Sequence, residues 1–326
     1  MKQPSGAETP AEPPPLVSIV ALCYNHARFV REALDSVVAQ TYPHWELIVV
    51  DDASTDASAA AIAGWVAANP GRVAHVQYLT SAESRGACAA FNQGLARCRG
   101  EFVVDLATDD VLLPTRLAEQ VAAFGALDAS YGVVYTDAEL ITEDGRFVRH
   151  HYTRTPAGQL TPAPASGAVF ADVLGRYFIS TPTMLIRRQV LTELGGYDER
   201  LAYEDFDFWV RSARRWRYHF LDRVLTRKRL HPRAHSRQFY RPGDPQLAST
   251  IRVCAHAATL CRTAPEWAAL RQRLRYELRQ AVRYRLWPEA HALASQLRAL
   301  PNVALAERLL ARLIAVVGGR IAPRAY

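Results

Sequence analysis

The sequence predicts an α/β fold in which a doubly wound, mostly parallel sheet is followed by an all-helical extension. Two observations support this prediction. Between residues 17 and 136, short apolar runs alternate with segments of helical periodicity. From about Gln246 onward, only helical periodicity remains. Because strands that alternate with helices are joined by right-handed crossovers, the first observation implies that neighbouring strands run parallel.

Strands and helices follow one another in the first half of the chain. Apolar runs predict strands at residues 17–23, 45–50, 73–79, 102–106 and 131–136. Apolar residues three and four positions apart predict helices at residues 27–40, 56–69, 86–98 and 114–127. After Asp137 the alternation ends. The segment Glu143-Asp144-Gly145 is typical of a hairpin turn, and we expect residues 155–167, rich in proline, alanine and glycine, to form a loop over the functional site.

Length and composition are those of an ordinary globular protein. The 326 residues are 49% apolar and 22% charged, enough for one large domain with an appendage. Five prolines in the first fifteen residues predict a disordered leader at 1–15. We expect the main domain at 16–240 and a helical region at 241–326.

The leader has no apolar stretch of the kind that secretory signals carry, and no apolar run reaches the roughly 18–20 residues that cross a bilayer. Five scattered cysteines without a Cys-x-x-Cys pair favour reduced thiols and a cytoplasmic protein.

The net charge of +7 is unevenly distributed, with arginines concentrated after Arg187. A basic second half indicates anionic lipid head groups or an acidic substrate as partners, or simply a solvated basic surface. No nucleic-acid recognition motif accompanies the charge, so we expect no nucleic-acid partner.

Polar and acidic motifs follow the predicted strands. The first strand ends at Tyr24-Asn25, the second at Asp51-Asp52, and the fourth is followed by Thr108-Asp109-Asp110. In open α/β sheets, ligands bind beyond the carboxyl ends of the strands. Later segments carry Gly195-Gly196-Tyr197-Asp198-Glu199, then Glu204-Asp205 among aromatic residues, and Arg229-Leu230-His231.

Taken in this order, the motifs resemble those of family 2 glycosyltransferases, which are inverting, nucleotide-sugar-dependent enzymes of the Rossmann-like GT-A fold. The similarity covers roughly residues 17–236. It implies that residues 16–240 are a catalytic domain that transfers a sugar from a nucleoside-diphosphate donor, a UDP-sugar being favoured. The acceptor would be a saccharide or a lipid-linked saccharide, in the synthesis of cell-surface polysaccharide or glycoconjugates.

The resemblance implies that several motif residues bind the nucleotide sugar. An aspartate can accept hydrogen bonds from a base N–H or from ribose hydroxyls. The resemblance places Asp52 in that role, with Asp51 supporting it. Asp56 could contact the ligand or only cap the following helix. The full set of predicted nucleotide-sugar-binding residues is Tyr24, Asn25, Asp51, Asp52, Arg85 and Asp110.

A diphosphate leaving group calls for a divalent cation, Mg²⁺ or Mn²⁺, held by carboxylate and phosphate oxygens. The family motif is Asp-x-Asp, but Ala107 stands in its first position. Asp109 is therefore the expected metal ligand, with Asp110 contacting the ribose-phosphate side or ordering the loop. His231 is the candidate for a second metal ligand or a diphosphate contact, and His235 is an alternative.

The reaction also needs a general base near the acceptor hydroxyl. The resemblance assigns this role to Asp205, with Glu204 orienting it or binding the acceptor. Aromatic neighbours and an adjacent carboxylate both raise the pKa of a carboxyl group, which suits a base.

Two other functions are alternatives to glycosyl transfer. Ala107 is compatible with a degenerate nucleotide-sugar-binding protein that has no transfer activity. A sugar nucleotidyltransferase would favour a glycine-rich, basic loop after the first strand, and Cys23-Tyr24-Asn25-His26 is neither.

The helical region contains a basic stripe beside an apolar one. Its arginines are Arg271, Arg275, Arg279 and Arg283, and its apolar residues are Leu270, Leu274, Leu278 and Val282. One interpretation is a helix at the inner face of the cytoplasmic membrane, giving peripheral attachment. The other is a helix packed on the catalytic domain, with its arginines in water. Residues 308–321 form another short basic and apolar segment.

Overall fold

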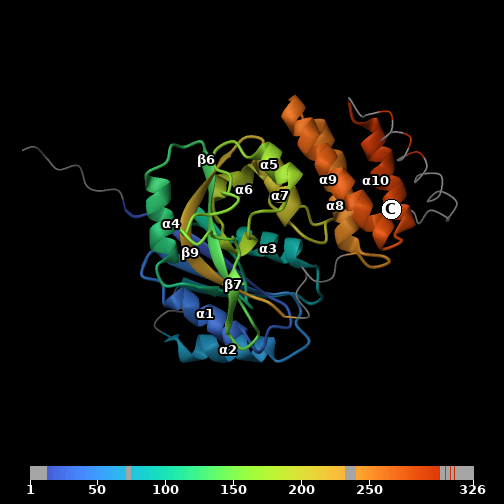
Figure 1. Ribbon diagram of the computed structural model, residues 1–326. Helices are drawn as coiled ribbons and strands as arrows, with labels where there is room; N and C mark the ends of the chain where they lie inside the picture. The colour runs from blue at the N-terminus through green and yellow to red at the C-terminus, as the bar shows by residue number, and fades with distance from the viewer. Residues whose placement is uncertain are drawn as a thin grey trace, which may run out of the picture.

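The computed structural model describes residues 13–70, 75–231 and 240–301, together with Leu305, Leu309 and Arg312. Most of the predicted leader, His235 and nearly all of the segment 308–321 lie outside the described residues. Figure 1 shows a central sheet with helices on both faces, and the C-terminal helices α8, α9 and α10 side by side at one flank.

The first half of the sheet is parallel, as the sequence predicts. It contains β1 (Val17–Cys23), β2 (Trp45–Asp51), β3 (Val76–Thr80) and β4 (Phe102–Ala107). They lie in the order β3-β2-β1-β4, and every neighbouring pair is parallel. The helices between them are α1 (Val30–Val38), α2 (Ser58–Ala68) and α3 (Ala87–Leu95). The predicted strands and helices are confirmed here, although each helix is shorter than expected.

The second half of the sheet is mixed and was only partly predicted. β6 (Tyr131–Ile141) runs five residues beyond the predicted strand end and pairs in parallel with β9 (Arg217–Arg229). β8 (Leu185–Arg187) is antiparallel between β4 and β6, and β5 (Val111–Leu112) pairs with β9. β7 (Phe147–His150) forms the predicted hairpin with β6.

The sequence did not predict β9, because its residues are largely charged. In the structure one of its charges has a partner on the neighbouring strand: Arg227 lies opposite Glu139 of β6, with 2.9 Å between Nε and Oε2. An opposite-charge pair across two strands stabilises a sheet without any apolar side chain. A search for apolar runs therefore misses this strand.

The remaining helices follow in chain order: α4 (Arg116–Gly125), α5 (Phe170–Gly175), α6 (Arg188–Leu194), α7 (Asp205–Ser212), α8 (Pro245–Leu260), α9 (Ala264–Arg283) and α10 (Trp287–Ala299). A short 3₁₀ helix, η2, spans Thr181–Thr183. The helix-only region predicted from Gln246 onward is confirmed by α8 to α10. The division of the chain at residue 240 into two domains stays a prediction.

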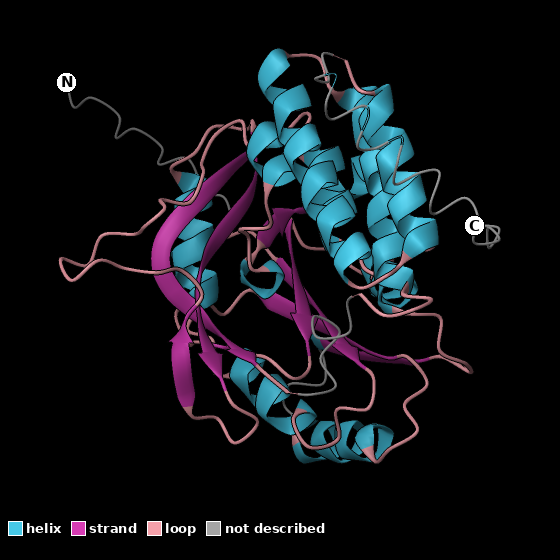
Figure 2. Ribbon diagram, turned by 45° about the vertical axis from the view of Figure 1, so that its right-hand side comes forward, coloured by secondary structure: helices cyan, strands magenta, loops and turns pink. Residues whose placement is uncertain are grey.

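Two hydrophobic cores cover the two faces of the sheet, as the helix layers in Figure 2 indicate. Side chains alternate along a strand, so Val20 of β1 packs in the first core and Ile19 in the second. The second core lies under α1, α2 and α4. The first extends from the sheet through α3 and α7 to Leu270 of α9 and Leu293 of α10.

The apolar stripe of helix α9 faces the interior of the protein. Leu270, Leu274 and Leu278 are buried in the core shared with the sheet. The packed-helix interpretation is thus confirmed for the leucines, while most arginines of the stripe are exposed. Among the described helices, none combines the length and apolar character needed to cross a membrane.

Candidate active site

Six of the predicted site residues, Tyr24, Asn25, Asp51, Asp52, Asp109 and Asp110, lie where β1, β2 and β4 end. Cys23 lies opposite Asp51, and Leu22 lies opposite Ala107, so the three following loops start at one level of the sheet. Backbone hydrogen bonds join them, from Asp52 N to Cys23 O at 2.9 Å and from Thr108 N to Leu22 O at 3.0 Å. These three loops therefore lie side by side at one edge of the sheet.

The loop after β1 is held by the side chain of Asn25. This residue has φ of 58°, a left-handed conformation that asparagine tolerates better than most residues. Its Oδ1 accepts hydrogen bonds from Thr55 N at 2.8 Å and Asp56 N at 3.2 Å. Asp56 in turn accepts hydrogen bonds from Ala27 N and Ser58 N. Of its two predicted roles, ligand contact and a structural role at the start of the helix, these bonds support the structural role. For Asn25, a nucleotide-sugar contact stays a prediction.

Asp51 and Asp52 are buried at the end of β2 and shape the neighbouring loops. Asp51 Oδ1 accepts from Ser54 N at 3.1 Å. Asp52 accepts from Arg85 N and Gly86 N, both at 2.9 Å, and from the Ser84 hydroxyl at 2.7 Å. A carboxylate has about four acceptor positions, so Asp52 retains capacity for one more donor.

Arg85 and Tyr24 are the exposed members of the predicted nucleotide-sugar set. The Arg85 guanidinium pairs with Glu199 at 2.9 Å, which links the loop before α3 to the Gly195–Glu199 motif. Tyr24 is 45% exposed, so its ring is open to a ligand beside the strand ends.

Asp109 and His231 lie together, although 122 positions separate them in the chain. The distance from His231 Nε2 to Asp109 Oδ2 is 2.9 Å, and both side chains are largely buried. Burial alone would raise the pKa of Asp109, but the hydrogen bond from His231 and the nearby imidazoles outweigh it and lower that pKa. The structure therefore brings the two predicted metal ligands together.

A second imidazole, that of His26, is the third member of the same group. One ligand atom each from His26, Asp109 and His231 lie within 4.8 Å of one another. The sequence analysis did not single out His26, because a lone histidine after a strand carries no spacing signal. Only the convergence of the loops after β1 and β4 brings it beside Asp109.

Asp110 points into the protein. It accepts a hydrogen bond from Arg229 N at 2.8 Å, and burial and the charge of Asp109 raise its pKa to about 8. Arg229 also donates through Nε to Asp109 O at 2.9 Å. Of the two roles predicted for Asp110, ordering of the loop is the one its contacts support.

Asp205 and Glu204 lie at the start of α7, beside Asp105 of β4. The Thr181 hydroxyl donates to Asp205 Oδ1 at 2.5 Å, and the Tyr197 hydroxyl donates to Asp105 Oδ2 at 3.1 Å. Burial, followed by the charges of Asp205 and Asp105, raises the pKa of Glu204 well above its usual range. Burial also raises the pKa of Asp105 to about 7, with a contribution from Asp205.

Asp105 is thus grouped with the predicted base and not with the metal ligands. Asp105 was not among the predicted site residues, because it lies too early in the strand to replace the carboxylate missing at Ala107. It lies four residues before Asp109, so β4 and its loop contribute one carboxyl group to each of the two groups.

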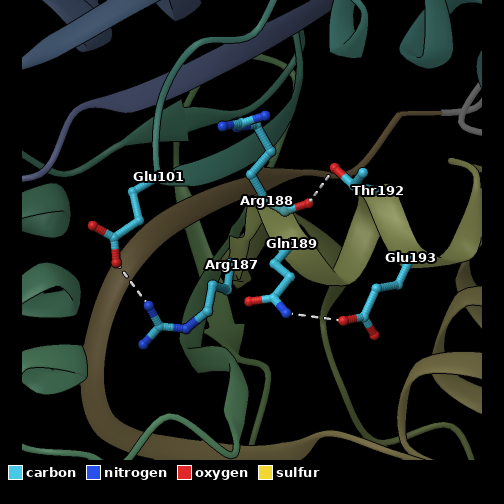
Figure 3. A pocket seen from close by; sticks show the side chains of 6 residues that line it. All are labelled: Glu101, Arg187, Arg188, Gln189, Thr192 and Glu193. Carbon is cyan, nitrogen blue, oxygen red and sulfur yellow. Dashed lines mark hydrogen bonds and ion pairs between the residues drawn. The ribbon is translucent and has the colours of Figure 1, made fainter.

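Two of the cavities among the described residues lie away from the metal-ligand group. One, of about 520 Å³, is lined by side chains around Arg187 and Glu101, and Figure 3 shows that pair in contact. Phe102 and Arg187 pair at the start of β4, the end opposite to Asp109. The other, of about 810 Å³, lies between the loop at Gly195–Asp198 and α8.

Solved structures share this fold over nearly the whole chain. One is S. aureus TarS (residues 1–349) in complex with UDP-GlcNAc, with a TM-score of 0.65, 18% identity and coverage of 94% of this chain and 89% of that one. Another is the mannosyltransferase PcManGT from Pyrobaculum calidifontis in complex with GDP-Man and Mn²⁺. Its TM-score is 0.59 at 20% identity, covering 97% of this chain and 84% of that one. The predicted GT-A-type α/β fold is confirmed.

The chain is also similar in sequence to several curated proteins. The chain is 33% identical over 186 residues to the O-antigen biosynthesis protein RfbC of Myxococcus xanthus, covering 57% of this chain and 13% of that protein. The chain spans 31% to 64% of the length of four Rickettsia glycosyltransferases that it matches. Residues 18–195 match the sequence profile described as glycosyl transferase family 2. The chain belongs to this family.

Proposed function

We propose that this protein transfers a sugar from a nucleoside-diphosphate sugar to an acceptor hydroxyl with inversion, in cell-surface polysaccharide or glycoconjugate synthesis. The observation that carries the proposal is that two groups of side chains lie beside β4 and the loop that follows it. Asp109 with His231 supplies ligands for a cation, and Asp205 with Glu204 supplies carboxylates for proton transfer. Membership of family 2 and the relative named for O-antigen biosynthesis support it.

The residues around Asp109 fit a divalent cation. A carboxylate and neutral imidazoles are ligands for Mn²⁺, and a carboxylate also suits Mg²⁺. Such a cation, when bound, would supply positive charge to the diphosphate that leaves. The nucleotide would lie beside Tyr24, with Asp51 and Asp52 holding the adjacent loops and Arg85 at their edge. A UDP-sugar remains the favoured donor.

The chemical step is a direct displacement. The acceptor oxygen forms a bond to the anomeric carbon while the bond from that carbon to the diphosphate oxygen breaks, which inverts the configuration. Asp205 takes the proton of the acceptor hydroxyl, and the Thr181 hydroxyl fixes its orientation. Burial and the charges of Asp205 and Asp105 raise the pKa of Glu204, which orients Asp205 or binds the acceptor.

The two rival functions have weaker support. In the loop after β1, Asn25 is bonded to the loop after β2, and this is not the glycine-rich cradle expected of a nucleotidyltransferase. A nucleotide-sugar-binding protein without activity would need no proton acceptor, yet Asp205 is oriented by a hydroxyl and flanked by two further acids.

Donor binding and turnover test the proposal. Thermal shift with UDP-, GDP- and dTDP-sugars identifies the donor, because a ligand that binds only the folded state stabilises it. Donor hydrolysis or transfer is then measured with and without Mn²⁺, in the wild type and in Asp109→Asn. We expect metal-dependent turnover that Asp109→Asn abolishes. Donor binding without any turnover would favour the degenerate binding protein, and unchanged Mn²⁺ dependence in Asp109→Asn would contradict the metal assignment.

We further propose that the acceptor is a saccharide or a lipid-linked saccharide, and that the enzyme acts on the cytoplasmic side of the membrane. Any peripheral contact would use the arginines of α9, since the leucines of that helix are buried.

A further inference from the structure

The imidazole of His26 converges with Asp109 and His231 from a third part of the fold. His26 follows β1, Asp109 follows β4, and His231 follows β9. The rings of His26 and His231 are 6.2 Å apart between centroids and nearly perpendicular, at 89°. Their ligand atoms and a carboxylate oxygen of Asp109 lie within 4.8 Å of one another.

The hydrogen bonds of Thr108 determine which nitrogen of His26 carries the proton. A threonine hydroxyl has a single proton, and that of Thr108 is donated to Leu22 O at 2.9 Å. The contact of 3.0 Å between Thr108 Oγ1 and His26 Nδ1 therefore requires the proton on Nδ1. The nitrogen of His26 that carries no proton is then Nε2, and its lone pair is the one that can bind a metal ion. Metal-binding histidines commonly donate their other N–H to an oxygen in this way.

The backbone around His26 is fixed as well. His26 N donates to Ser58 Oγ at 2.9 Å, and the preceding residue, Asn25, is bonded to the loop after β2. The spacing of the other two ligands is also suitable. Ligands on adjacent corners of an octahedron with bonds of about 2.1 Å are about 3 Å apart, and the distance from His231 Nε2 to Asp109 Oδ2 is 2.9 Å.

We infer that His26 is a third metal ligand, and that it replaces the carboxylate which an Asp-x-Asp motif would supply at Ala107. The inference rests on the proposed function, in which Asp109 and His231 hold a cation. The ligand set also predicts which metal ions this site prefers. Two imidazoles and one carboxylate suit Mn²⁺, Co²⁺ or Zn²⁺ better than Mg²⁺, which favours oxygen ligands.

Direct metal binding tests this inference without relying on activity. Free Mn²⁺ is titrated by electron paramagnetic resonance, and Mg²⁺ binding is measured by competition, on the full chain. We expect the wild type to prefer Mn²⁺, and His26→Ala to weaken Mn²⁺ binding by about 10-fold or more. Thr108→Val, which removes the orienting hydroxyl, should weaken it in the same direction. His44→Ala is the matched control, because His44 is exposed at the opposite end of the sheet.

A ligand exchange gives a second readout. His26→Asp keeps three ligands but replaces a nitrogen with an oxygen, so the preference for Mn²⁺ over Mg²⁺ should narrow. The visible absorption bands of bound Co²⁺ should also shift. Thermal melting followed by circular dichroism identifies any variant that fails to fold.

The outcomes separate the two proposals. If Asp109→Asn and His231→Ala lose Mn²⁺ while His26→Ala binds it as tightly as the wild type, the inference about His26 is wrong and the proposed function stands. If none of the three substitutions changes Mn²⁺ binding, the metal assignment in the proposed function is wrong as well.

Discussion

Three acidic side chains around the start of α7 differ in their surroundings, and those differences assign their roles. Asp205 accepts a hydrogen bond from Thr181, whereas Asp105 accepts one from Tyr197. Burial raises the pKa of Glu204 well above its usual range and that of Asp105 to about 7. Pairs of carboxyl groups whose environments differ in this way commonly divide acid and base functions.

The substitution Asp205→Asn tests the assignment of the base. Asparagine keeps the shape of the side chain and can still accept from Thr181, but it cannot take a proton. We expect sugar transfer to fall by roughly 10²–10⁴-fold, the usual range for loss of a general base. Donor binding, measured by thermal shift, should remain. Glu204→Gln is the companion variant, and if it proves more damaging than Asp205→Asn, the two roles must be exchanged.

Sequence motifs indicated part of the site at this scale. Asp109, His231 and Asp205 were identified because each belongs to a recognisable motif, and the structure places Asp109 beside His231. His26 and Asp105 were missed, because their relevance arises only from contacts between loops and strands far apart in the chain. Asn25 and Asp52 form hydrogen bonds that order loops, and their predicted contact with the nucleotide sugar stays a prediction.

The loop between α6 and α7 connects Asp205, the proposed general base, to the sheet. Gly196 has φ of 81°, and an added Cβ would lie 2.3 Å from Asn92 Oδ1. Asn92 accepts from Tyr197 N at 2.9 Å and donates to Tyr197 O at 2.8 Å. The close approach of Gly196 thus holds the tyrosine that reaches Asp105.

Gly196→Ala should therefore destabilise the fold more than Gly195→Ala. Both glycines have positive φ, but an added Cβ at Gly195 meets no atom within 4 Å. We expect about 1–2 kcal/mol for the left-handed conformation in either variant. Displacement of Asn92 should add about 1–3 kcal/mol in Gly196→Ala. Urea unfolding measures the difference, and equal losses in the two variants would show that the Asn92 contact contributes nothing.

Element prediction succeeded where burial makes the sequence apolar. The strands β1 and β2 are buried along most of their length and therefore appear as continuous apolar runs. β9 was missed because ion pairs such as Arg227 with Glu139 replace apolar packing along it. β5 and β8 have two and three residues, too few for any periodicity to be visible.

The two faces of helix α9 differ in charge and burial. Its leucines are inside, and Arg275, Arg279 and Arg283 are exposed. Each basic residue near an anionic membrane contributes on the order of 1 kcal/mol, weakened by salt. The helix could hold the enzyme near lipid by charge alone, without insertion.

Vesicle sedimentation measures this attachment. We expect pelleting with anionic vesicles at low salt, release at high salt, and none with neutral vesicles. Replacing Arg275, Arg279 and Arg283 with glutamine should reduce pelleting. Replacing three exposed arginines elsewhere, Arg97, Arg146 and Arg149, serves as the matched control for net charge. Equal loss of pelleting in both triple variants would show that overall charge, and not the position of the α9 arginines, causes the attachment. If the wild type does not pellet with anionic vesicles, the predicted membrane contact is wrong.

The hydrophobic core shared by the sheet and the C-terminal helices has a consequence for protein engineering. Arg273 of α9 lies over the ring of Tyr177, 3.9 Å from its centroid, and over the ring of Phe206, which is the neighbour of Asp205. One layer of side chains therefore separates the C-terminal helices from the residue proposed to take the acceptor proton. These helices are unsuitable as an interchangeable module, because a graft from another transferase would have to reproduce the wall against which α7 is packed.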